Sequence, residues 1–216
     1  MVVGVQTSEN KKTATFNLRL VAQQKYDFVF WADCATETNN GTFSDLHYNT
    51  SDLTNITVMG GYVGNNDEFD AFFFCKTDYT VTESFAETSW VLRRPFGQLN
   101  VKTNDMTAIY DNTLKPTKVK VALTALPTSF NAKTGTVGEQ TANVEYEAEV
   151  INQANGELTV DYIWAPVEEA ALVNFSMKFY NNETLICENE DFKNIPVRRN
   201  YKTNVSGNLL TKQGTI

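Results

Sequence analysis

Near its C-terminus the chain reads IPVRRNYKTNVSGNLLT over residues 195–211. Side chains of opposite character alternate along this stretch, which is the pattern of a β-strand with one dry and one wet face. The dry side carries Ile195, Val197, Tyr201, Thr203 and Val205, and the wet side carries Arg198, Asn200, Lys202, Asn204 and Ser206. We therefore expect one long closing strand that borders several others, with Gly207 allowing a bend at its end. Arg199 falls on the dry side, where a guanidinium needs a partner or a position at the rim.

Strand patterns recur along most of the chain. Residues 26–33 and 70–76 are largely apolar, which is typical of strands buried on both faces. Residues 13–21 alternate and come just before 26–33, so the simplest arrangement pairs these two stretches as a hairpin. Further strand-like stretches cover residues 117–124, 142–150, 158–164 and 171–180. Short strands separated by turns predict an all-β protein.

The spacing of these strands predicts two tandem β-sandwich domains. The N-terminal domain is expected over residues 1–112 and the C-terminal domain over residues 113–216, with the boundary at the polar pair Asp111-Asn112. In residues 89–102 the apolar pattern changes phase near Pro95, which predicts a bulge or a strand that crosses between sheets. No apolar stretch is long enough for a transmembrane helix, and no secretory signal is visible at Met1.

Net charge limits the partners that the chain can bind. The formal charge is -8 at pH 7, whereas nucleic acid and anionic membranes both attract basic surfaces. We therefore expect neither of them as a partner. The main basic cluster is Arg198, Arg199 and Lys202. We expect Arg198 and Lys202 to balance the acidic strand over residues 143–149.

The sequence contains no set of residues that is specific for catalysis, a metal or a cofactor. A single histidine, His47, cannot build an ordinary zinc site or a typical catalytic triad. The acidic pair Glu168-Glu169 reads as solvated surface, and residues 65–70 read as a polar turn and not as a calcium loop. Cys34 and Cys75 could pair, or all three cysteines could be buried thiols. We predict a protein that is not an enzyme and uses no cofactor.

Several segments, in order, resemble those of Bacteroides-type fimbrillin-like proteins, which are related to the major fimbrial subunits of type V pili. The segments are Trp31-Ala32-Asp33, Asp70-Ala71-Phe72-Phe73, Arg94-Pro95-Phe96, Phe130-Asn131 with Thr134-Gly135, and the closing stretch. The resemblance spans residues 26 to 211. It implies structural family-motif roles for Trp31, Asp33, Arg94, Pro95, Phe96, Asn131, Arg199, Asn200, Tyr201 and Gly207.

The resemblance implies a fold and a location as well. Such proteins typically have two transthyretin-like, Greek-key β-sandwich domains and are lipoproteins of the outer-membrane surface. The chain is thus expected to be a cell-surface structural or adhesion protein, a fimbrial (pilus) subunit that assembles with other subunits through β-strand exchange or binds a host or bacterial surface ligand. Peripheral attachment to the outer membrane is expected if a longer precursor is lipidated.

Two departures from the family pattern affect this expectation. No lipobox cysteine occurs near Met1, and the residues before Thr13 are too few for the family's usual first strand. A missing first strand would leave a groove of unpaired backbone groups in the N-terminal domain, which favours pairing with another chain.

The alternative function is glycan binding by an outer-surface β-sandwich module. A groove of exposed backbone would favour strand exchange, whereas a pair of solvent-facing aromatic side chains on residues 34–62 would favour glycan binding. Trp31, Trp90 and Trp164 lie in apolar stretches, where packing in a core is the better interpretation.

Overall fold

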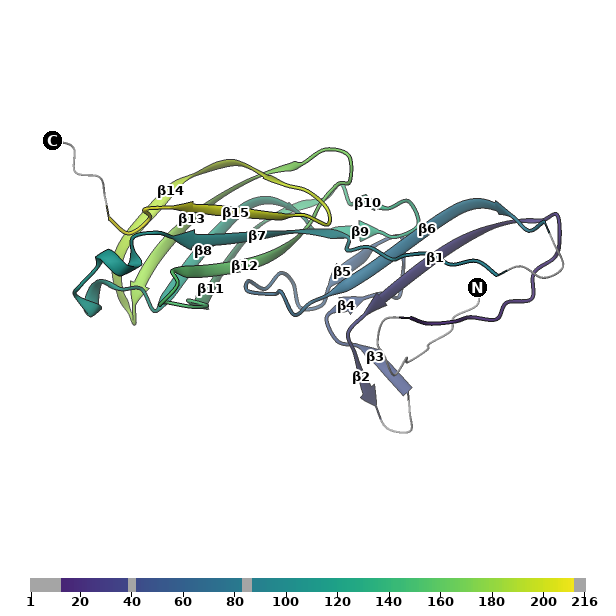
Figure 1. Cartoon of the computed structure of the whole chain (residues 1–216), viewed down its shortest axis with the longest axis horizontal. Helices are drawn as coiled ribbons and strands as arrows, with labels where there is room; N and C mark the ends of the chain where they lie inside the picture. Colours follow the sequence, from purple (N-terminus) through teal and green to yellow (C-terminus); the bar gives the residue numbers. More distant parts are fainter. Residues whose placement is uncertain (1–12, 39–41, 83–86, 212–216) are drawn as a thin grey trace.

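The computed structural model describes residues 13–38, 42–82 and 87–211. Figure 1 shows an elongated molecule built from β-strands, so the predicted all-β class is confirmed. The strands are β1 Lys25–Asp33, β2 Ala35–Thr38, β3 Thr42–Asp45, β4 Tyr48–Asn49, β5 Ile56–Val58, β6 Ala71–Thr80, β7 Phe96–Thr103, β8 Lys118–Pro127, β9 Ser129–Asn131, β10 Thr136–Val137, β11 Thr141–Glu149, β12 Glu157–Trp164, β13 Ala171–Asn181, β14 Thr184–Val197 and β15 Lys202–Gly207. Two short 3-10 helices, Met106–Ala108 and Asn112–Leu114, connect β7 to β8. No helix in the described part of the chain has the length and apolar character needed to cross a membrane.

A β-sandwich forms one end of the molecule (Figure 1). One sheet has the order β11-β8-β13-β14 and the other has the order β12-β7-β15. The alternating stretches predicted from the sequence supply β8, β11 and β13, because their inward side chains fill the space between the sheets. The largest fully buried side chains of this core are Leu99, Leu123, Leu158, Ile163, Met177 and Phe179.

Strands from either side of residue 112 share sheets. β7 lies between β12 and β15, and β9 pairs with β5. A second core also draws on both halves of the sequence: Tyr48, Ile56, Ala71, Phe73, Phe96, Phe130, Ala132 and Trp164. The division into domains over residues 1–112 and 113–216 stays a prediction.

The expectation of one long closing strand is wrong. β14 ends at Val197, the chain turns, and β15 begins at Lys202 in the opposite sheet, parallel to β7. Asn200 adopts a φ of 62° at this turn, and the Tyr201 N–H donates to the Arg198 carbonyl at 3.1 Å. A left-handed residue cannot continue a strand, so the chain crosses from one sheet to the other here.

The predicted hairpin of residues 13–21 with residues 26–33 is also wrong. Residues 13–21 form no strand, and β1 instead pairs antiparallel with β6, with Trp31 opposite Phe73 and Phe30 opposite Phe74. Such cross-strand aromatic pairs stabilise a sheet, and residues 13–21 offer only one aromatic side chain, Phe16. The strand expected over residues 89–102 likewise begins only at Phe96.

The acidic strand β11 is balanced by a different set of cations from the one expected. On the adjacent strand β8, Lys118 pairs with Glu147 at 3.2 Å and Lys120 pairs with Glu145 at 2.7 Å. Arg198 instead donates to the Val167 carbonyl at 3.1 Å and lies over the Tyr201 ring. The expectation that Arg198 balances β11 is therefore wrong, because β8 and not the closing stretch is the neighbour of β11.

Candidate functional site

Within the described residues, the sheet formed by β1 and β6 has an open edge. These two strands pair with each other and with no further strand in the part of the chain that the structure describes. The outer edge of β6 is joined to the following segment by an isolated bridge between Phe73 and Arg93. Along the outer edge of β1, alternate backbone N–H and C=O groups point away from β6. A third strand could add to this edge through main-chain hydrogen bonds.

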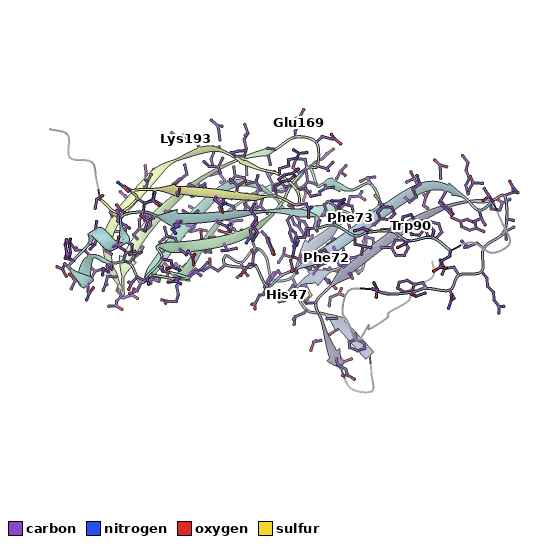
Figure 2. The ribbon with its side chains drawn as sticks, in the orientation of Figure 1. His47, Phe72, Phe73, Trp90, Glu169 and Lys193 are labelled. Carbon is purple, nitrogen blue, oxygen red and sulfur yellow. The ribbon has the colours of Figure 1, made fainter. Side chains whose placement is uncertain are left out.

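One face of this two-stranded sheet carries a cluster of aromatic rings, which we call the aromatic face: Phe28, Phe30, Phe74, Tyr79 and Trp90. Trp90 lies against the sheet (Figure 2), with its ring centroid 5.1 Å from that of Phe28 and 5.5 Å from that of Phe30. All five side chains are only half-buried. The expectation that both faces of β1 are buried is therefore wrong: Val29 and Trp31 pack on the second core, and the aromatic face is partly open to solvent.

Residues 13–21 continue this partly open apolar surface. Phe16 lies 6.3 Å from Phe30 between ring centroids, and the Val21 N–H donates to the Tyr26 hydroxyl at 2.9 Å. Phe16 and Leu18 are each 39% exposed and Val21 is 64% exposed. An alternating extended segment with exposed apolar side chains thus lies beside a sheet that has an open edge.

Several of the predicted motif residues meet where the β1–β6 sheet joins the sandwich. Arg199 is only 7% exposed, and it donates to the Ala165 carbonyl at 3.0 Å and to the Gly135 carbonyl at 2.6 Å. Its guanidinium lies 5.1 Å from the ring centroids of both Phe73 and Phe130. The partner that the sequence predicted for Arg199 therefore consists of carbonyl groups and aromatic rings.

The neighbouring motif residues shape the same junction. Trp31 and Phe96 pack on the second core with Trp164. The Asn131 amide oxygen accepts from Lys133 N and Thr134 N, which holds the turn that presents the Gly135 carbonyl to Arg199. The Asn200 N–H donates to the Phe96 carbonyl at 2.9 Å. These contacts hold the sheet against the sandwich.

The remaining motif residues differ in how exposed they are. Arg94 makes a bidentate ion pair with Asp70 at 2.8 and 3.0 Å, and Pro95, which follows it, is buried. Tyr201 is largely exposed. Gly207 ends β15, and its carbonyl accepts from the Asn104 N–H at 2.8 Å. Its backbone needs no special conformation, because no positive φ occurs there.

Asp33 is a partly buried carboxyl group at the end of β1. Burial raises the pKa of Asp33 to about 6; the Trp31 indole opposes this rise and the like charge of Asp45 adds to it. The geometry offers Asp33 no metal site, because no group of three or more His, Cys, Asp or Glu side chains in the described residues could hold an ion.

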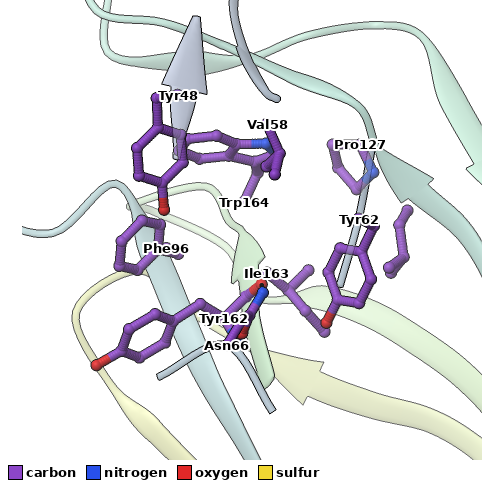
Figure 3. A pocket seen from close by; sticks show the side chains of 10 residues that line it. Tyr48, Val58, Tyr62, Asn66, Phe96, Pro127, Tyr162, Ile163 and Trp164 are labelled. Carbon is purple, nitrogen blue, oxygen red and sulfur yellow. Dashed lines mark hydrogen bonds between the residues drawn. The ribbon is translucent and has the colours of Figure 1, made fainter. Parts of the chain in front are cut away.

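The interior beside the junction holds a small cavity of about 20 Å³ (Figure 3). Tyr48, Tyr62, Asn66, Phe96 and Trp164 are among its lining residues. This volume is enough for about one water molecule and too small for an organic ligand.

The His47 ring stacks on Phe69 with centroids 3.8 Å apart, so His47 packs on a ring instead of pointing freely into solvent.

The aromatic face was missed by sequence reasoning. Its signal is present in residues 26–33, where aromatic side chains occupy positions 26, 28, 30 and 31. A run of this kind does not tell which face lies in a core.

The hypothesis of a Cys34–Cys75 disulfide fails on geometry. Cys75 lies opposite Val29, which is too far along the strand from Cys34 for a disulfide.

A protein family matches the whole chain, residues 1–216, and its description is "Family of unknown function (DUF6562)". The chain belongs to this family. No curated protein matches it. Two crystal structures from Bacteroides ovatus are similar to this DUF6562 chain, each with a TM-score of 0.44. One is of a candidate adhesin at 11% identity, with 91% of this chain and 78% of that chain covered. The other is of a candidate cell adhesion protein at 17% identity, with 95% and 69% covered. At this TM-score the likeness carries no argument about function.

Proposed function

We propose that this chain is a non-catalytic adhesion protein of the cell surface that joins another subunit by accepting a β-strand at the open edge of β1. The observation that carries this proposal is the two-stranded β1–β6 sheet with its half-buried aromatic face. A sheet of two strands is marginally stable, and a third strand with an apolar face stabilises it. Exposed apolar patches of this kind mark sites of protein interaction.

The incoming strand needs apolar side chains at alternate positions, so that its apolar side chains extend the aromatic face beyond β1 and the other side chains lie on the opposite face. Residues 13–21 of a second copy have this pattern, with Ala14, Phe16, Leu18 and Leu20 in phase. Repeated addition from one copy to the next would build a fimbrium, which is the assembled form that the fimbrillin resemblance implies.

Self-association of the full chain tests this proposal. We expect sedimentation velocity to show concentration-dependent association, and Leu18→Asp to weaken it by more than about tenfold, because burying one Leu contributes about 1.5–3 kcal/mol. Leu172→Asp is the matched control: Leu172 is 62% exposed on the sandwich, and its replacement should leave association unchanged.

A peptide gives the second arm of the test. A synthetic peptide of residues 13–21, added to the Leu18→Asp chain, should raise the Tm, whereas a scrambled peptide of the same composition should not. A monomeric wild-type chain with no response to the peptide would exclude strand addition at β1.

The alternative, a glycan-binding module, would be favoured by a pair of solvent-facing aromatic side chains on residues 34–62. Of the aromatic side chains in residues 34–38 and 42–62, Phe43 is exposed, Tyr48 is buried and Tyr62 is half-buried. The pair of solvent-facing rings that would favour a glycan is therefore not formed by these described residues.

A further inference from the structure

Residues 60–69 close the open flank of the sandwich, where the edge strands β11 and β12 of the two sheets meet. The Asn65 side-chain oxygen accepts from Val160 N at 3.0 Å, and the Asn66 side-chain oxygen accepts from Tyr162 N at 2.6 Å. The Asn65 amide also donates to the Glu149 carbonyl of β11 at 3.1 Å. Two asparagine side chains thus occupy the positions at which a neighbouring strand would bond to β12.

The same loop is seated against the sandwich through Gly64 and Tyr62. A Cβ atom placed on Gly64 would come within 2.0 Å of the Tyr146 ring, so the backbone of the loop lies directly on that ring. Tyr62 reaches further in, and its hydroxyl donates to Asp161 at 3.0 Å. The loop therefore contacts both sheets and a buried acid between them.

Asp161 is 1% exposed and is the centre of this contact. The Tyr146 hydroxyl lies 2.8 and 2.7 Å from its two oxygens, and the Tyr62 hydroxyl lies near one of them. Thr159 lies on the same face of β12, and its buried hydroxyl favours the charged form of Asp161, as the two tyrosine hydroxyls do.

Among the residues that the structure describes, no cation is one of the groups that shift the pKa of Asp161. The groups that act on it are Tyr146 from β11, Tyr62 and the Asn65 backbone from the loop, and Thr159 from its own strand. β7 places Leu99 opposite Asp161 in the sheet. Burial raises the pKa of both tyrosine hydroxyls well above the usual range, so they stay protonated donors.

We propose that residues 60–69 form a latch whose hold on the sandwich is controlled by protonation of Asp161. Burial raises the pKa of Asp161 from 3.8 to about 6, although hydrogen bonds from Tyr146 and Tyr62 oppose this rise. A group whose pKa is raised in the closed state stabilises that state at low pH, and this contribution is lost as the pH rises through the raised value. The latch is therefore tightest in acid, loosens as the pH rises from 3.8 to about 6 and stays loose above that, because an opened loop lets water reach the carboxylate.

Hydrogen exchange of the full chain tests the latch. Between pH 5 and pH 8, after correction for intrinsic exchange rates, the opening constant of residues 60–69 should rise about tenfold, as expected for a carboxyl group with a pKa of about 6 when closed and 3.8 when open. Asp161→Asn should remove this dependence. Asp105→Asn is the control, because hydrogen bonds from Thr103 and Thr211 lower the pKa of Asp105 against the effect of its burial, so it does not titrate in this range.

Direct titration covers the case in which Asp161→Asn does not fold. Carbon-13 NMR of the wild-type chain should show one Asp carboxyl near pH 6 whose midpoint moves upward in Tyr62→Phe and Tyr146→Phe, since each variant removes a donor to the charged form. Asp33, which shares the raised value, should not move. An Asp161 carboxyl that titrates near pH 4, or loop opening that does not change with pH, would overturn the proposal. Neither outcome bears on strand addition at β1, because none of the residues changed in these tests lies on β1 or in its aromatic face.

Discussion

At the scale of single residues, the two adjacent arginines of the turn between β14 and β15 differ sharply. Arg199 is buried with its two carbonyl partners and two rings, whereas Arg198 lies on the surface over Tyr201. Alternation along the sequence identified Arg199 as the exception on the dry face. It could not name Ala165 and Gly135 as partners, because these carbonyl groups come from turns distant in the sequence.

Arg199→Ala should lower the free energy of unfolding by about 3 kcal/mol, because it removes two charge-assisted hydrogen bonds and leaves two carbonyl groups without a donor. Arg198→Ala should cost about 0.5 kcal/mol, as is usual for an exposed cation beside a ring. Urea unfolding of both variants measures the difference. Equal losses would show that the buried arginine contributes no more than the exposed one.

Asp33 makes stability depend on pH. Its pKa is raised to about 6, so its contribution to stability is present below pH 3.8 and is lost as the pH rises through 6. The side chain is partly exposed, and we discount the effect of the shift for solvent screening. Asp33→Asn should thus gain about 1 kcal/mol relative to wild type between pH 4 and pH 7.5. Urea unfolding at both pH values measures this gain, and a constant difference would contradict the assignment.

At the scale of elements, the crossing from β14 to β15 depends on the left-handed Asn200. Asn is one of the few non-glycine residues that tolerate this conformation. Asn200→Gly should leave stability within about 0.5 kcal/mol of wild type, whereas Asn200→Val should cost about 2 kcal/mol, because a branched side chain is strained at positive φ. Thermal unfolding of the pair separates backbone strain from loss of the side chain. Similar Tm values for the two variants would mean that the turn relaxes.

The other elements differ in how far the sequence predicted them. β8, β11 and β13 coincide closely with their predicted stretches, because each has one face in the sandwich core and therefore alternates. β12 also coincides with its predicted stretch, although its buried side chains do not alternate strictly. Residues 13–21 alternate equally well and form no strand. Alternation shows that a segment can form a strand, but the partner decides whether it does.

At the scale of the whole molecule, the sandwich depends on a strand from before residue 112. β7 is the middle strand of β12-β7-β15, so a fragment of residues 113–216 lacks the centre of one sheet. We expect this fragment to give no cooperative thermal transition by circular dichroism. A fragment of residues 95–216 keeps β7 and should unfold cooperatively, at a lower Tm than the full chain. Cooperative unfolding of residues 113–216 alone would instead support the predicted boundary at residue 112.

The sequence by itself determined the all-β class, the strands that alternate, and the need of Arg199 for a partner. Each of these follows from the order of apolar and polar side chains along the chain. Only the tertiary structure decided that the stretch over residues 195–211 divides between two sheets, that β1 pairs with β6, and that Tyr62 and Tyr146 meet at Asp161. The physical reason is that strand pairing and buried hydrogen bonds join residues far apart in the sequence. Local polarity shows that such a residue is buried, but it carries no information about which distant group lies against it.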